Sequence, residues 1–375
     1  EFRRVLFRSI PKFMEPHTTV VGQTYDVGNY EESLNRALEA ADYAGWRKKQ
    51  ATLRAAGGAR QIGIGVSVYV EITGGVGNGE QAKIEILGDG RAVIYTGTSP
   101  HGQGHATSWA MLASEKTGIP IDMIDLVWGD TDLVPVGGGT MGSRSLQLGG
   151  AAVQKASREL IEQAKKHAAR LLEANEADVV FDRDHGAFHV AGTPAVAKTW
   201  ADVALAQQDD GGLSQYTTFP SAGPTFPFGS HVAVVEVDVE TGQVRHVRHV
   251  ACDDAGRVLN PLILDGQIHG GIAQGAAQAL LEEVRYDQDG NPITSNLADY
   301  AFISAAELPS FEVVHMETPT PRNPLGAKGI GESGTIGSTP AVQSAVIDAV
   351  AHLGIRHIDM PATSERVWRA IHDAR

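Results

Sequence analysis

Three glycine-rich loops are the segments of this chain whose residue types and spacing point most clearly to chemistry. They span residues 97–105, 137–145 and 326–334, and each runs into a segment with the apolar pattern of a helix. Glycine lets the backbone approach a ligand closely, and a helix N-terminus offers N–H donors and a positive dipole end. One such loop is weak evidence. Three together predict a large ligand with many polar edges, such as a dinucleotide-type cofactor.

A single carboxylate, Glu332, stands in the third loop. Two interpretations of it are open. As an acid at a helix start, it would interact favourably with the helix dipole and do nothing else. As a general base, it would take a proton from a group beside the bound ligand. The residue pattern alone does not choose between them.

The remaining motifs are weaker. None of the loops follows a strand as G-x-G-x-x-G with an acidic residue downstream, and no G-x-x-x-x-G-K-[ST] occurs. His101 and His105 have the spacing of a metal pair on a helix, but Gly102 and Gly104 lie between them, so the pair is not expected to bind metal. The single cysteine, Cys252, is expected to be a buried strand residue.

The elements that must position these residues follow from hydrophobic periodicity. Helices are predicted at residues 31–50, 104–117, 149–174, 200–208, 264–283, 338–352 and 364–372. Strands are predicted at residues 61–73, 82–87, 91–96, 123–128, 179–181, 187–190, 231–239, 244–252 and 312–317. Strand pairs alternate with helices without a regular βαβ rhythm, which predicts an α+β fold of mixed sheets with packed helices.

Composition limits the function classes. The chain has 375 residues, enough for two domains or one large one, and its 42% hydrophobic content suffices for a packed core. Its 31 Lys and Arg against 45 Asp and Glu give a net charge of −14, which argues against nucleic acid and anionic membrane surfaces. No apolar run is long enough for a transmembrane helix. One cysteine excludes an internal disulfide or an all-cysteine metal site, and it favours a reducing compartment.

Residues 1–9 are basic and apolar without a signal-peptide cleavage site. We expect them to be a tag remnant, an artefact of sequencing or assembly, or the end of a larger protein. The sequence from Ile10 onward is expected to begin within a domain.

Several motifs, in the same order, resemble the molybdopterin-binding large subunit of the xanthine dehydrogenase family, and in particular its aerobic carbon monoxide dehydrogenase branch. The resemblance covers roughly Ile10 to the C-terminus. The motifs that carry it are residues 102–105, 129–132, 142–145, 228–282, 323–325, 326–332 and 359–363. It implies that residues 10–54 are the tail of a first molybdopterin-binding domain and residues 55–375 a second one.

The resemblance also implies roles for individual residues. Gln103, with Gly102, Gly104 and His105, would contact the pterin and the oxo ligand of molybdenum. The second loop would hold pterin and phosphate edges through Thr140, Met141, Gly142, Ser143, Arg144 and Ser145. Lys328, Gly329, Ile330 and Gly331 would line the cofactor, and Glu332 would be the catalytic base. Cys252, Asn260 and Gln267 would lie toward the dinucleotide end. The implied cofactor is molybdopterin with molybdenum, in the cytosine dinucleotide form.

The implied enzyme is a molybdenum hydroxylase. It would oxidise carbon monoxide, an aldehyde or an N-heterocycle, with water as oxygen source. Electrons would pass to a small subunit with 2Fe-2S clusters and then to a medium subunit with FAD, in a cytoplasmic dimer of heterotrimers or one associated with the inner face of the membrane.

Large subunits of this family are about twice as long, so we expect a C-terminal fragment that lacks the loop that selects substrate, and the fragment alone is expected to be inactive. Two alternatives stay open: a non-catalytic relative that acts as a binding or assembly scaffold, and an unrelated phosphate enzyme with glycine loops.

Overall fold

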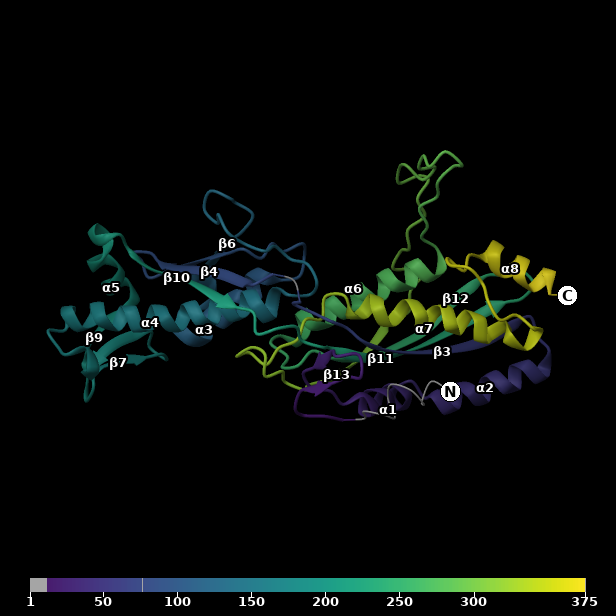
Figure 1. Ribbon diagram of the computed structural model, residues 1–375, viewed down its shortest axis with the longest axis horizontal. Coiled ribbons are helices and arrows are strands. Elements are labelled where there is room, and N and C mark those ends of the chain that lie inside the picture. The colour runs from purple at the N-terminus through teal and green to yellow at the C-terminus, as the bar shows by residue number, and fades with distance from the viewer. Residues whose placement is uncertain (1–11, 76, 375) are drawn as a thin grey trace. The chain divides into compact units, whose positions relative to one another are not determined.

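The computed structural model describes residues 12–75 and 77–374, and the predicted nature of residues 1–9 therefore lies outside the described residues (Figure 1). The chain forms two compact units. Unit 1 is made of the chain up to Ile72, Phe226–Pro319 and the chain from Ile330 onward, and unit 2 is made of Thr73–Thr225 and Thr320–Gly329. The predicted domain boundary between residues 54 and 55 falls inside unit 1, and as a family boundary it stays a prediction.

Unit 1 is built on a four-stranded sheet in the order β13-β12-β11-β3. The strands are β3 (Arg60–Val70), β11 (Phe228–Asp238), β12 (Val244–Asp254) and β13 (Phe311–Met316). The pair β11–β12 is the hairpin that the alternating sequence predicts, and β13 joins β12 in parallel.

Helices cover both faces of this sheet (Figure 1). Helices α6 (Pro261–Leu280) and α7 (Ser333–Val350) lie on one face, and α1 (Tyr30–Ala40) and α2 (Tyr43–Ala56) lie on the other. Helix α8 (Ser364–Asp373) and the short strands β1 (His17–Thr18) and β2 (Thr24–Tyr25) complete the described elements of the unit.

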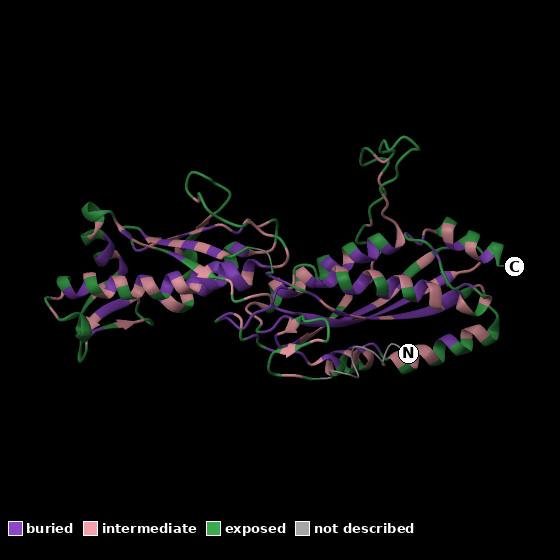
Figure 2. Cartoon of the chain, viewed as in Figure 1, coloured by how far each residue is buried: buried purple, intermediate pink, exposed green. Residues whose placement is uncertain are grey.

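The core of unit 1 fills both faces of β11, because successive side chains of a strand point to opposite sides. Ala233, Val235 and Val237 pack with α7, whereas Val232 and Val234 pack with α1. Strands β3, β11 and β12 are buried over most of their length, and the connection from α6 to β13 is largely exposed (Figure 2).

Helix α7 packs so closely on β3 that only glycine fits at two positions of the strand. A Cβ on Gly63 would lie 1.9 Å from the carbonyl oxygen of Ala345, and a Cβ on Gly65 would lie 1.9 Å from that of Ala341. No residue larger than glycine fits at either position without moving the helix. The two glycines therefore set how closely α7 approaches the sheet.

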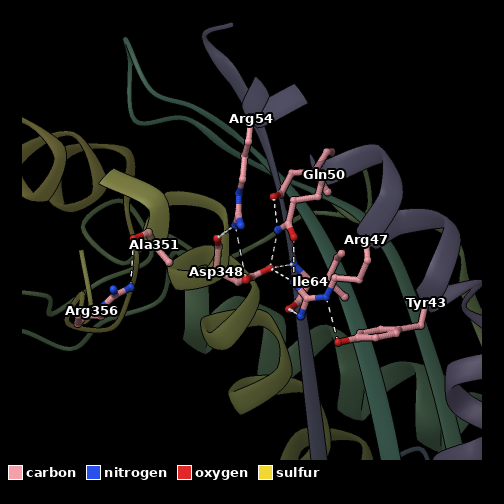
Figure 3. A network of polar contacts seen from close by, with 9 residues as sticks. Tyr43, Arg47, Gln50, Arg54, Ile64, Asp348, Ala351 and Arg356 are labelled. Carbon is pink, nitrogen blue, oxygen red and sulfur yellow. Dashed lines mark hydrogen bonds and ion pairs between the residues drawn. The ribbon is translucent and has the colours of Figure 1, made fainter. Parts of the chain in front are cut away.

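One carboxylate ties α2, β3 and α7 together (Figure 3). Oδ2 of Asp348 accepts hydrogen bonds from Arg47 Nη1 at 2.7 Å, Gln50 Nε2 at 2.6 Å and the backbone N–H of Ile64 at 2.8 Å. Arg54 donates to the backbone carbonyl of Asp348. The charge of the half-buried carboxylate is thus met by donors from two other elements, which couples α2 to the α7 side of the sheet.

Unit 2 contains a second four-stranded sheet in the order β10-β4-β5-β6. Its strands are β4 (Gly79–Ile86), β5 (Ala92–Thr96), β6 (Ile124–Val127) and β10 (Leu213–Pro220), and helices α3 (His105–Thr117) and α4 (Ala151–Leu171) pack in the same unit. A three-stranded sheet of β7 (Val179–Asp182), β8 (Ala187–Val190) and β9 (Thr193–Thr199) precedes α5 (Trp200–Ala206). Burial along β4 alternates residue by residue, as expected for a strand with one face in the core.

The predicted α+β class is confirmed, and three local predictions need correction. The helix predicted over residues 31–50 is two helices, because Asp42 has a left-handed backbone (φ 50°) and its side chain accepts from the Gly45 N–H to cap α2. Strands β9 and β10 were not predicted. Helix α7 begins at Ser333 rather than Ser338, so Gly334 and Gly337 lie inside it.

Candidate cofactor-binding site

The three glycine loops contact one another in unit 2, to which the third loop contributes its residues up to Gly329. A Cβ on Gly97 would lie 2.3 Å from Cα of Gly137, and the Gly139 N–H donates to the Gly97 carbonyl at 3.0 Å. A Cβ on Gly329 would lie 2.0 Å from the carbonyl oxygen of Ser143. The first loop therefore touches the second, and the second touches the third, at backbone distance.

The first loop ends in a helix start with open backbone. Helix α3 begins at His105, one residue later than predicted, and its N-cap residue Gly104 makes no side-chain capping hydrogen bond. Gly102 has φ 109°, and a Cβ built on it would meet no atom within 4 Å. Gln103 bends back over the loop, where its Oε1 accepts from the His101 N–H. Residues 102–104 thus leave room beside a helix N-terminus for a ligand with acceptor groups.

His105 is a buried, neutral residue at the start of α3. Its ring stacks on Trp109 with centroids 4.9 Å apart. Burial lowers its pKa to about 4, and the charge of His101 adds to that shift. Because α3 begins at His105, His101 does not lie on the helix, as the glycines between the two histidines predict. No group of three or more His, Cys, Asp or Glu placed to hold a metal ion occurs in residues 12–75 and 77–374.

A buried ion pair holds the second loop. Arg144 Nη1 lies 2.9 Å from Glu80 Oε2, with both side chains at most 3% exposed. The same Arg144 donates to the backbone carbonyls of Gly139 at 3.2 Å and Gly79 at 2.6 Å, and Glu80 Oε2 accepts from the Gly138 N–H at 3.1 Å. Arg144 is therefore an anchor of the loop, and its contact with a cofactor stays a prediction.

The remainder of the second loop runs from exposed to buried residues and contains a left-handed backbone at a non-glycine residue. Thr140 and Ser145 join their hydroxyls at 3.0 Å. Gly142 and Ser143 both have left-handed backbones (φ 55° and 50°), and a Cβ on Gly142 would meet no atom within 4 Å. Met141 is exposed. Left-handed backbone at a non-glycine residue is held in place only by its surroundings, and such positions cluster at ligand sites.

Gln147 is a site residue that the sequence did not reveal. It lies in a π-helical turn, Ser145–Gly150, that precedes α4, and such turns are frequent at functional sites. Its side chain is 2% exposed, its Oε1 accepts from Thr225 at 2.7 Å, and its Nε2 has no hydrogen-bond partner among the described residues. A buried donor without a partner indicates a place for a ligand acceptor. A single glutamine between the second loop and the predicted helix carries no pattern by which this could have been found.

The third loop is divided between the units. In unit 2, Asn323 holds it: Nδ2 donates to the Ala327 carbonyl at 2.7 Å, and Oδ1 accepts from the N–H groups of Leu325 and Ala327. Lys328 is 1% exposed. In unit 1, Ile330 packs against a cluster that includes Leu264 and Ile268. These two attachments define where residues 326–330 run.

Glu332 is exposed and occupies the N-cap position of α7 without capping the helix through its side chain. The helix behind it is closely fitted, because a Cβ on Gly334 would lie 2.6 Å from the carbonyl oxygen of Ile268 on α6. An exposed carboxylate at a closely packed helix start is suited to accept a proton.

The three residues placed toward the dinucleotide end lie in unit 1. Cys252 is fully buried, and burial, with the charge of Asp253 adding, raises the pKa of its thiol to about 12, so it is an inert core residue. Asn260 caps α6 by accepting from the Ile263 N–H at 3.2 Å. Gln267 is half-buried on α6. For all three, contact with a cofactor stays a prediction.

These residues fit the predicted cofactor. The loops of unit 2 present open glycine backbone at Gly102 and Gly142, an uncapped helix start at Gly104 and a buried donor at Gln147. A cofactor with many oxygen and nitrogen edges matches this set of donors.

Residues 36–309 match the family described as molybdopterin cofactor-binding domain. The chain belongs to this family. The carbon monoxide dehydrogenase large chain of Hydrogenophaga pseudoflava is 39% identical over 97% of this chain and 47% of that protein. Subunit gamma of the 6-hydroxypseudooxynicotine dehydrogenase complex of Paenarthrobacter nicotinovorans is 36% identical over 94% and 45%.

Among solved structures, the crystal structure of the Cu,Mo-CO dehydrogenase in its carbon monoxide reduced state superimposes with a TM-score of 0.85 at 34% identity, over 99% of this chain and 48% of that chain. The predicted resemblance and fold are thereby confirmed. This member of the molybdopterin cofactor-binding domain family spans about half the length of these relatives. No helix in its described part has the length and apolar character needed to cross a membrane.

Proposed function

We propose that this chain is the cofactor-binding, catalytic part of a molybdenum hydroxylase and that Glu332 is its general base. The observation that carries the proposal is the exposed carboxylate of Glu332 at the start of α7, in a chain whose other glycine loops leave open backbone for a cofactor. When bound, the molybdenum cofactor supplies two-electron oxidation of the substrate.

In this proposal the residues of unit 2 bind and orient the cofactor. The N–H groups at the start of α3 and the backbone at Gly102 and Gly142 meet its acceptor edges, and Gln147 Nε2 donates from within the π-helical turn. Gln103 and Lys328 contribute polar groups from the first and third loops. Arg144 and Asn323 act indirectly, by holding the loops in place.

Glu332 then handles one proton. One of its carboxylate oxygens accepts the proton released as an oxygen derived from water is added to the substrate. A neutral helix start would offer no acceptor, whereas a carboxylate at this position offers one.

The finer features belong to the same proposal. The cofactor is the cytosine dinucleotide form of molybdopterin, and the substrate is a small molecule such as carbon monoxide, an aldehyde or an N-heterocycle. The partners are a small subunit with 2Fe-2S clusters and a medium subunit with FAD, in a cytoplasmic dimer of heterotrimers. The names of the relatives support this range, since one acts on carbon monoxide and one is part of a 6-hydroxypseudooxynicotine dehydrogenase complex.

Glu332→Gln in the intact assembly tests the proposal, because Gln keeps the volume but accepts no proton at neutral pH. Base catalysis contributes about 10²–10⁴-fold, so we expect turnover per bound molybdenum to fall at least about 10²-fold, with molybdenum and pterin content unchanged. Glu31→Gln, at another exposed helix start (α1), is the matched control and should leave turnover intact.

If Glu332 is only an acid at a helix start, its replacement costs at most about 1 kcal/mol of stability and leaves turnover nearly unchanged. A Glu332→Gln enzyme with full molybdenum and more than about half of the wild-type rate, against the loss that base catalysis predicts, ends the catalytic proposal. An assembly that contains the wild-type chain but holds no molybdenum would instead favour the scaffold alternative.

A further inference from the structure

A continuous series of buried polar side chains crosses the α6–α7 face of the sheet in unit 1 and ends at the residue after Glu332. Its members are His246, His249, His231, Asp253, Tyr69 and Ser333, and none is more than 8% exposed. We refer to these six residues as the buried polar series. They come from β12, β11, β3 and the first residue of α7.

The histidines form a row of ring-to-ring contacts. His246 Nε2 lies 3.3 Å from His249 Nδ1, and His249 Nε2 lies 3.0 Å from His231 Nδ1. The rings meet edge to face, with centroids 5.2 and 5.1 Å apart. Burial lowers the pKa of His249 well below its usual value and that of His246 to about 4, so both are neutral near pH 7.

Asp253 receives hydrogen bonds at one end of the histidine row. Its carboxylate accepts from Tyr69 Oη at 2.7 Å. It also lies 3.2 Å from His231 Nε2, which donates because a carboxylate only accepts. The ring-to-ring contacts continue from His231 to His249 and His246.

The other end of the series holds the first turns of α7. The Ser333 hydroxyl donates to Glu71 Oε2 at 2.8 Å, and Tyr69 lies beside the same hydroxyl. Four residues further on, a Cβ on Gly337 would lie 2.5–2.7 Å from the ring of His231. The series therefore meets α7 at two points about one helical turn apart, and the first point is adjacent in sequence to Glu332.

Stability alone gives little reason for this arrangement. Buried polar groups must all find partners, and apolar residues of similar volume stabilise a core as well or better. The α1 face of the same strands is filled mainly by apolar side chains, including Ile62, Val232 and Val250. A costly polar series that ends beside a proposed proton acceptor indicates a functional role.

We propose that Asp253 and Tyr69 are positioning residues for Glu332. Asp253 orients the hydroxyl of Tyr69, and Tyr69 with Ser333 holds the first turn of α7, which carries Glu332 at its N-cap. The histidine row orients Asp253 by donating to it. This inference rests on the proposed function, because the placing of Glu332 matters only if Glu332 acts on the substrate.

Tyr69→Phe in the intact enzyme is the test, and Tyr30→Phe is the matched control. Both tyrosines are buried in unit 1, but Tyr30 packs on the opposite face of the sheet, against Phe228. We expect Tyr69→Phe to lower kcat per bound molybdenum about tenfold or more, since small misplacement of a catalytic group has effects of this order. The KM and the molybdenum content should stay as in wild type. Tyr30→Phe should leave kcat unchanged.

A second readout does not depend on activity. Hydrogen exchange of the backbone amides of residues 333–337 should become faster in Tyr69→Phe and in Ser333→Ala, and it should be unaffected in Tyr30→Phe. Ser333→Ala deletes a single hydroxyl and serves in place of Tyr69→Phe if that variant does not fold.

Unchanged kcat and unchanged exchange in Tyr69→Phe and Ser333→Ala, or equal changes in Tyr30→Phe, overturn the proposal. Glu332→Gln measured in parallel separates the two claims. If Glu332→Gln is inactive and Tyr69→Phe is fully active, the positioning role is wrong and the general base stands. If Glu332→Gln is active, the proposed function itself fails.

Discussion

Two helices of this chain begin after glycine-rich loops, and they use their glycines in opposite ways. At the start of α3 in unit 2, Gly102 faces open space and Gly104 leaves the helix uncapped. At the start of α7 in unit 1, Gly334 and Gly337 are pressed against Ile268 and His231, with no room for a Cβ. The first helix start keeps space for a ligand from outside the chain. The second removes space so that a side chain, Glu332, is carried at a defined place.

The polar anchors of the two units also differ. In unit 2, an ion pair between Glu80 and Arg144 holds the second glycine loop, which contacts the loop before α3. In unit 1, the buried polar series reaches the start of α7 through Asp253, Tyr69 and Ser333. The open loop is held by a charged side chain that donates hydrogen bonds to its backbone. The helix is held through the side chain of its first residue, Ser333.

The ion pair gives the largest expected effect. Arg144→Met leaves Glu80 buried without its partner, and breaking a buried pair in this way costs about 3–5 kcal/mol. Chemical denaturation followed by a probe in unit 2 measures the loss in the free energy of unfolding. Lys165→Met, which removes a mostly exposed pair with Glu162 on α4, should have nearly no effect. Equal losses in the two variants would show that the buried pair does not hold unit 2.

A pair of glycine substitutions sharpens the comparison between open and closed positions. Gly337→Ala forces a Cβ against the buried ring of His231 and should destabilise unit 1 by about 1–3 kcal/mol. Gly270→Ala on α6 meets no atom within 4 Å at a helical position and should stabilise it by about 0.5–1 kcal/mol. Thermal unfolding of both variants checks the opposite signs. If Gly337→Ala is neutral, α7 is not as closely held as its contacts imply.

The pH dependence of stability tests whether His246 is neutral in the folded protein. Burial lowers the pKa of His246 to about 4, so between about pH 4 and its unfolded value near 6.5 the unfolded chain binds more protons. Stability must therefore rise with pH through this window and is lost on acidification. For His246 alone, about 2 kcal/mol should disappear between pH 7 and pH 5.

Urea unfolding at the two pH values measures this loss, and the same measurement on His246→Phe provides the control. That variant should show a smaller difference between pH 7 and pH 5. An identical pH dependence in His246→Phe and wild type would mean that the row is not neutral in the folded protein.

Local sequence was sufficient to predict the features that depend on a pattern of a few neighbouring residues. Alternating apolar residues predicted the β11–β12 hairpin, and a glycine loop before an apolar segment predicted α3, which begins one residue later than expected. The order of the motifs predicted the family. Each of these depends on neighbours in the chain, so the residues themselves carry the information.

Only the tertiary structure determined the features that depend on contacts between residues far apart in the sequence. Gly334 and Gly337 disfavour a helix locally, and the sequence accordingly places the start of α7 too late. The helix forms over them because α6 and His231 need their empty space. Glu80 and Arg144 are 64 residues apart, and Tyr69 and Asp253 are 184 apart. No periodic pattern links such pairs, because their contact exists only after the sheets have formed.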